Sequence, residues 1–128
     1  MPIYFVCLLL VLLMPLLLAL LNDVVRVRSF GKLDNAAPRQ QSAQLEGIGA
    51  RVWAAQQNAW EAVLIFTVVV FVGHELNAEV ESFDRAAMVF VLARVLHSGF
   101  YIADLATLRS LSFFLSLGSC LWILRLVW

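Results

Sequence analysis

Hydrophobic residues form four long runs along the chain, and shorter segments between the runs hold most of the charges. The runs cover about residues 2–21, 52–72, 86–103 and 108–127. The third run is the least uniform, because Arg94 and His97 interrupt it. A helix needs about 20 residues to cross the roughly 30 Å hydrocarbon core of a bilayer, and each run approaches that length. The pattern therefore predicts four membrane-spanning helices.

The composition supports this class of protein. Of the 128 residues, 62% are hydrophobic and 14% are charged, and the mean hydropathy is +0.89; a soluble domain has about 25% charged residues. We expect an all-α integral membrane four-helix bundle in which residues 1–128 form one domain. The formal net charge is zero, which favours neither a nucleic-acid-binding protein nor a polybasic membrane anchor. No basic residue precedes the first run, which is longer than a signal-peptide core, so we expect a retained span.

The connections between the runs differ in charge. The first connection holds four basic residues, Arg26, Arg28, Lys32 and Arg39. The third connection leads to Arg109, whereas the second, residues 74–84, is acidic. The positive-inside rule then places the first and third connections in the cytoplasm and both termini on the far side of the membrane. Within the first connection, residues 34–38 predict a turn, and the second helix is expected to begin near Ser42. Asp104 or Thr107 is expected to cap the fourth helix.

Two stripes of polar residues lie on the second and third predicted helices. The first stripe is Arg51, Asn58 and Glu61, and the second is Arg94, His97, Tyr101 and Asp104. Residues three, four or seven positions apart lie on one face of a helix. Ionisable groups in a bilayer cost about 2.5–3.5 kcal/mol each on insertion scales, so they are usually paired or functional.

A count of depth predicts how the stripes meet. Glu61 and Arg94 each lie about ten residues, or roughly 15 Å, from the cytoplasmic end of their helices, so we expect an ion pair between them. The same count places Asn58 opposite His97, and Tyr101 and Asp104 level with Arg51. The expected result is a polar cleft open to the cytoplasm, suited to a small anionic ligand. The alternative is a bundle held together by one buried ion pair and a few hydrogen bonds.

Arg109 and Ser110 lie at the start of the fourth predicted helix. A guanidinium group beside a helix N-terminus favours an anion, including a thiolate. Alternatively, Arg109 extends from the bilayer to the interface as an ordinary interfacial arginine. Cys7 and Cys120 lie within apolar runs and are expected to be buried hydrophobic residues. No spacing of Cys or His residues indicates a metal site.

The two stripes resemble the signatures of the MAPEG superfamily, the membrane-associated proteins of eicosanoid and glutathione metabolism. Residues 51–61 are similar to its Arg…Asn-x-x-Glu motif, and residues 93–110 to its Arg-x-x-His-x-x-x-Tyr…Arg-Ser motif. The segment 34–39 resembles the short bacterial branch. The resemblance implies a homotrimer in the inner membrane that binds glutathione between subunits and takes a lipophilic second substrate from the bilayer.

By position, the resemblance implies that Asn58, Glu61, His97 and Tyr101 contact glutathione, with support from Arg51 and Arg94. It also implies that Arg109 stabilises the thiolate and that Ser110 assists. The chain departs from the pattern at Ala54, Gln56 and Gln57, where well-studied glutathione-using members carry extra basic residues.

Two functional hypotheses follow. The first is a glutathione transferase or peroxidase, and the second is a non-catalytic lipid-binding or scaffold protein. An ion or proton path fits less well, since the polar column ends near the middle of the bilayer.

Overall fold

The computed structural model describes residues 1–128 and contains five helices. These are α1 (Ile3–Phe30), α2 (Pro38–Ala43), α3 (Gly47–Glu75), α4 (Val80–Ile102) and α5 (Ala106–Arg125). All except α2 are long and apolar enough to cross a membrane. The predicted all-α bundle of four long helices is confirmed, and the chain is an integral membrane protein.

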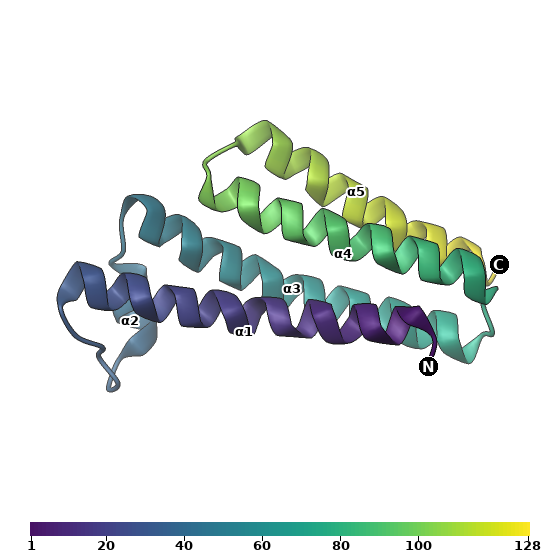
Figure 1. Cartoon of the computed structure of the whole chain (residues 1–128), viewed down its shortest axis with the longest axis horizontal. Helices are drawn as coiled ribbons and strands as arrows, with labels where there is room; N and C mark the ends of the chain where they lie inside the picture. Colours follow the sequence, from purple (N-terminus) through teal and green to yellow (C-terminus); the bar gives the residue numbers. More distant parts are fainter.

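The four long helices run antiparallel in chain order. Helix α1 packs mainly against α3, and α4 packs mainly against α5 (Figure 1). Both termini lie at one end of the bundle, together with the α3–α4 turn. Helix α2 lies at the opposite end, beside the end of α1 and the start of α3. The polar first connection is therefore at the end of the bundle farthest from the termini.

The first connection differs from the sequence prediction in one respect. The expected turn is present, because the Asp34 carboxylate accepts hydrogen bonds from the backbone N–H groups of Ala36 (2.9 Å) and Ala37 (3.1 Å). The second long helix does not begin near Ser42, however. Residues 38–43 form the separate helix α2, and α3 begins at Gly47. The left-handed backbone of Gly47 (φ 54°) separates the two helices, a conformation that glycine adopts without steric cost.

Side-chain capping positions α4 but not α5. The Glu79 carboxylate accepts hydrogen bonds from the backbone N–H groups of Glu81 and Ser82, both at 2.8 Å, so α4 begins before the expected apolar run. Hydrogen bonds from Ser82, and then from the Glu81 N–H, hold the pKa of Glu79 below its ordinary value. The expected cap on the fourth helix was wrong: Leu105 occupies the N-cap position of α5, and no side chain caps it.

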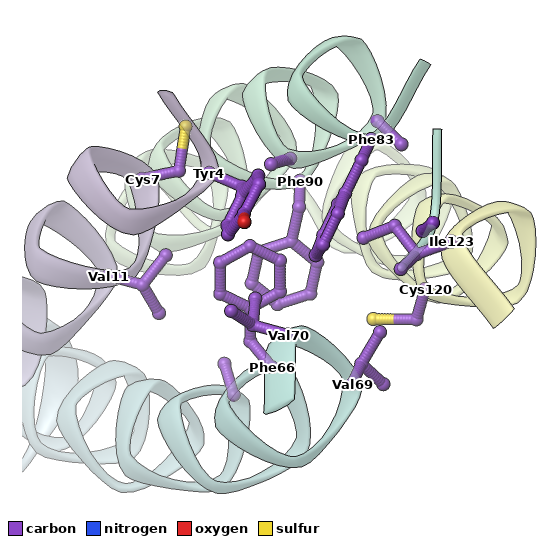
Figure 2. Packing of buried hydrophobic residues seen from close by; sticks show 14 residues of the cluster. Tyr4, Cys7, Val11, Phe66, Val69, Val70, Phe83, Phe90, Cys120 and Ile123 are labelled. Atoms are coloured by element: carbon purple, nitrogen blue, oxygen red, sulfur yellow. The ribbon is translucent and has the colours of Figure 1, made fainter. Parts of the chain in front are cut away.

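The main hydrophobic core lies in the half of the bundle that contains the termini (Figure 2). Tyr4 stacks on Phe83 with ring centroids 4.0 Å apart, and Phe66 stacks on Phe90 at 4.1 Å. Cys7 and Cys120 are buried with free thiols, as expected. Near the α2 end the core is much smaller and contains Leu18, Ala55 and Ala59. Small residues there leave room for the polar side chains of α3 and α4.

The outer surface is apolar. Only 33 of the 128 residues are buried, and many large hydrophobic side chains on all four long helices are exposed. In water such a surface would promote aggregation, whereas in a bilayer it contacts the acyl chains. The exposed polar residues on the spans are therefore the ones that require an explanation.

Candidate functional site

A buried arginine connects α4 to α3. Arg94 is 2% exposed, and its Nη2 group donates to the Asn58 side-chain oxygen and more weakly to the Asn58 backbone oxygen (3.4 Å). The Asn58 Nδ2 group in turn donates to Glu61 Oε2 at 3.1 Å. Asn58 therefore bridges the cation and the carboxylate. The expected direct ion pair was wrong, because no Glu61–Arg94 salt bridge is present.

Glu61 and Arg94 line the same recess, as their predicted depth requires, but the predicted partners of Arg94 and His97 were wrong. Asn58 lies one turn before Glu61 on the same face of α3, so it reaches the guanidinium group of Arg94 first. His97 follows Arg94 by three residues, which rotates its side chain by about 60° around α4. It therefore faces α5 instead of Asn58. Its Nδ1–H donates to the Arg109 backbone carbonyl at 3.0 Å, since a carbonyl oxygen can only accept.

A small recess lies beside the Arg94–Asn58–Glu61 chain. Its volume is about 40 Å³, room for a few water molecules. Residues of three helices line it: Asn58, Glu61, Ala62, Ile65, Phe90, Arg94, Phe113, Ser116, Leu117 and Cys120. Arg94 Nε and His97 Nε2 are buried without a hydrogen-bond partner. This part of the protein thus has unused donor and acceptor capacity, which a ligand can use.

Arg109 lies near the other end of this polar group. Its guanidinium carbon is 4.5 Å from the centroid of the Tyr101 ring, a cation–π geometry. Tyr101 also makes an edge-on contact with His97, at 5.8 Å between centroids. The Arg109 guanidinium group lies over Tyr101, which follows Arg94 by seven residues, about two turns or roughly 10 Å along α4. Arg109 is partly exposed and is the cation that a ligand can reach, whereas Arg94 is buried and bound to Asn58.

Arg51 connects α3 to the end of α4. Its Nε donates to the Ile102 carbonyl at 3.0 Å, and its Nη1 is 3.8 Å from Asp104 Oδ2. The prediction that Asp104 lies at the same depth as Arg51 is confirmed. The ion pair is partly exposed and contributes little to stability by itself. Its geometric effect is to hold the end of α4, and with it Tyr101, beside the start of α3.

The structure brings together most, but not all, of the predicted site residues. Ser110 is exposed and takes part in none of these contacts. Sequence reasoning missed Phe113, Ser116 and Cys120 as walls of the recess. The Ser116 hydroxyl donates to the Phe113 carbonyl of its own helix (2.7 Å). No sequence signal distinguished these residues from ordinary packing residues.

Comparison with known proteins identifies the group to which this arrangement belongs. The profile of the MAPEG family matches residues 3–127, which include every residue of both polar stripes. The chain belongs to the MAPEG family. No curated protein matched the chain. MAPEG proteins are commonly glutathione-dependent transferases or peroxidases, and they are commonly trimers. The Arg94–Asn58–Glu61 chain and the Arg109–Tyr101 pair are thus the polar centre of a MAPEG fold.

Proposed function

We propose that the protein is a glutathione transferase or peroxidase of the bacterial inner membrane, with its site facing the cytoplasm. The observation that supports this most directly is the position of Arg109 over Tyr101, about two turns along α4 from the buried Arg94, whose Nε is unpaired. Cations spaced along the polar centre suit an extended ligand with several negative charges. Glutathione carries two carboxylates and a thiol that must lose its proton to react.

The proposed roles follow from position. Arg51, Asn58, Glu61, His97 and Tyr101 bind the peptide part of glutathione, and Arg94 holds Asn58 in place. Arg109 stabilises the thiolate electrostatically, and Ser110 assists. The sulfur then attacks an electrophilic carbon of a lipophilic substrate and displaces a leaving group or adds to a conjugated double bond. With a hydroperoxide, the sulfur takes the distal oxygen and releases the alcohol, and a second glutathione yields the disulfide and water.

The proposal includes a homotrimer with the ligand between subunits. Glu61 is the middle residue of α3, yet it is exposed in the isolated chain. A carboxylate at that depth facing acyl chains would be costly. The recess of about 40 Å³ is also too small for a tripeptide. A neighbouring subunit that covers Glu61 and enlarges the recess resolves both problems.

A second candidate function is a non-catalytic lipid-binding or scaffold protein. The specific observation in its favour is that Gln56 and Gln57 occupy positions where glutathione-using relatives are expected to carry basic residues. Arg26, a buried cation on α1, already donates hydrogen bonds to Gln41 and Asp23. Fewer free cations would weaken the binding of glutathione carboxylates.

The two candidates are separated by assays on the purified full-length protein. We expect conjugation of a lipophilic electrophile with glutathione, and a loss of about 10²–10³-fold in turnover for Arg109→Ala. The matched control is Arg125→Ala, which removes an exposed arginine from the opposite end of the same helix. Unchanged turnover in Arg109→Ala would remove that residue from the mechanism. Calorimetry that shows no heat and no thermal stabilisation at millimolar glutathione would favour the scaffold.

A further inference from the structure

Cys120 lines the recess beside the Arg94–Asn58–Glu61 chain, and the proposed reaction with glutathione does not use it. The residue is 2% exposed with a free thiol, and Figure 2 shows its side chain directed from α5 into the bundle. The other cysteine of the chain, Cys7, is 4% exposed and belongs to the same hydrophobic core. The two thiols are almost equally inaccessible to water, and of the two only Cys120 lines the recess.

The charged neighbours of the two thiols differ. Burial disfavours the thiolate, the reactive form of cysteine, at both positions, so a difference in reactivity has to come from groups that assist a reaction. The charged neighbour of Cys7 is the Asp84 carboxylate, which accepts hydrogen bonds but donates none. The positive charge of Arg94 acts on Cys120 instead, and the Glu61 carboxylate lines the same recess. Only Cys120 has both a proton acceptor and a hydrogen-bond donor in its surroundings.

The donor beside Cys120 is a buried group without a partner. Arg94 is 2% exposed, its Nη2 group is bound to Asn58, and its Nε has no hydrogen-bond partner. A guanidinium group has donors only, so the free N–H favours a ligand that brings an acceptor oxygen. A carbonyl oxygen is such an acceptor. When a nucleophile adds to a double bond conjugated with that carbonyl, the oxygen gains negative charge and its hydrogen bond to a cation becomes stronger.

The edge of the recess is apolar and faces the bilayer. Ile65 and Leu117 both line the recess and are 45% and 40% exposed. Exposed side chains on the spans contact acyl chains, so a molecule from the bilayer reaches the recess between apolar groups. The volume of about 40 Å³ accommodates a small reactive group, while an attached alkyl chain can remain in the lipid. The recess therefore suits a lipophilic compound with one reactive carbonyl group at its end.

We infer that Cys120 is a site of covalent modification by lipophilic α,β-unsaturated carbonyl compounds. The Cys120 sulfur forms a bond to the β-carbon of the conjugated double bond, and the Arg94 Nε–H donates to the carbonyl oxygen. The thiol proton passes to the Glu61 carboxylate and from there to the α-carbon. The addition has no leaving group and needs no oxidant or reductant. Glutathione takes no part, so this inference and the proposed function can each fail without the other.

The test is the rate of thiol modification in the purified full-length protein in mixed micelles, without glutathione. The probe is 1-octen-3-one, and mass spectrometry of peptides measures the adducts on Cys120 and Cys7 separately. We expect Cys120 to react about 10²-fold faster than Cys7, the effect of one hydrogen-bond donor on a developing oxyanion. In denaturant the two rates should be equal. With 1-iodooctane, which alkylates thiols but has no carbonyl group, the folded protein should show no such preference.

A pair of variants tests the role of the guanidinium group. Arg94→Met should lower the rate at Cys120 to that of Cys7. The matched control Arg85→Met removes an exposed arginine of the same helix that does not line the recess, and the preference should persist. Loss of the fold in Arg94→Met would instead make both cysteines react rapidly, as in denaturant, so the direction of the change separates the two effects.

Three outcomes would overturn the inference. Equal rates at Cys120 and Cys7 in the folded wild type would show that the recess does not promote the addition. The same preference with 1-iodooctane would show that access alone, and not a carbonyl group, selects the reagent. A folded Arg94→Met protein that keeps the fast rate at Cys120 would exclude Arg94 as the donor. The first two outcomes use the wild-type protein and do not depend on the stability of any variant.

Discussion

The burial of Arg94 makes the stability of the bundle depend on Asn58. The side chain of Arg94 is almost inaccessible, its Nε has no partner, and its side-chain partner is the Asn58 amide. Replacement of Asn58 by leucine keeps a side chain of similar size but removes that acceptor. The guanidinium group would then retain only the weak contact with the backbone oxygen at 3.4 Å.

The expected loss can be bounded from two sides. A hydrogen bond to a charged group contributes about 1.5–3 kcal/mol, and breaking a buried charged pair costs about 3–5 kcal/mol. Because the backbone contact of Arg94 survives, we expect Asn58→Leu to lower the free energy of unfolding by about 2–3 kcal/mol. Replacement of both residues, Asn58→Leu with Arg94→Met, removes the buried charge as well. The double variant should therefore be more stable than Asn58→Leu alone.

The measurement is reversible unfolding in mixed micelles for the wild type, both single variants and the double variant. Gln57→Leu, which changes the exposed neighbouring residue, is the control and should stay within about 0.5 kcal/mol of the wild type. A loss of only about 0.6 kcal/mol in Asn58→Leu, the average for a hydrogen bond in a membrane bundle, would refute the reasoning. A double variant less stable than Asn58→Leu would refute it too.

Further predictions concern the packing and the capping of the helices. A methyl group on Gly73 would lie 2.9 Å from Phe83 ring carbons and 3.0 Å from Ile123 Cγ2, so Gly73→Ala should cost about 1–3 kcal/mol in unfolding experiments. Gly118→Ala meets open space in the interior of α5 and should instead stabilise by about 0.5–1 kcal/mol; equal effects of the two changes would contradict the packing. The lowered pKa of Glu79 stabilises the fold above the unfolded pKa of about 4.3, and this contribution is lost as the pH falls through the folded pKa. Glu79→Ala should therefore have a lower melting temperature than the wild type at pH 7, and the two melting temperatures should be equal at pH values under 3. A difference that does not depend on pH would exclude the cap as the cause.

The sequence predicted the spans well because the bilayer imposes a length on apolar helices. It predicted the helix ends poorly, since no such constraint acts outside the hydrocarbon core. Helix α3 continues beyond its apolar run to Gly47, and α4 begins at the Glu79 cap. The separate helix α2 has only six residues, too few for a periodic pattern to be visible.

In the site, the sequence predicted the depth of the polar side chains but not the direction in which they point. Counting residues along two antiparallel helices placed Glu61 and Arg94 at one level, since each residue advances by a fixed rise. The rotation of each helix about its axis has no comparable constraint in the sequence. Asn58 and Glu61 differ in direction by about 60°, so a modest rotation of α3 decides which of them reaches Arg94. Hydrogen-bond partners within a predicted cleft therefore require the structure.

Assembly and chemistry depend on different residues of this site. The exposure of Glu61 in the middle of α3 requires a cover in the membrane, and a catalytic trimer and a non-catalytic one would both provide it. A variant such as Glu61→Leu therefore tests subunit association, and its effect on turnover does not show what the site does. Arg109 lies at the start of α5, against Tyr101 and away from the middle of the spans. Its charge is available to a thiolate whether or not it supports packing. The comparison of Arg109→Ala with Arg125→Ala is consequently the measurement that distinguishes an enzyme from a binding protein.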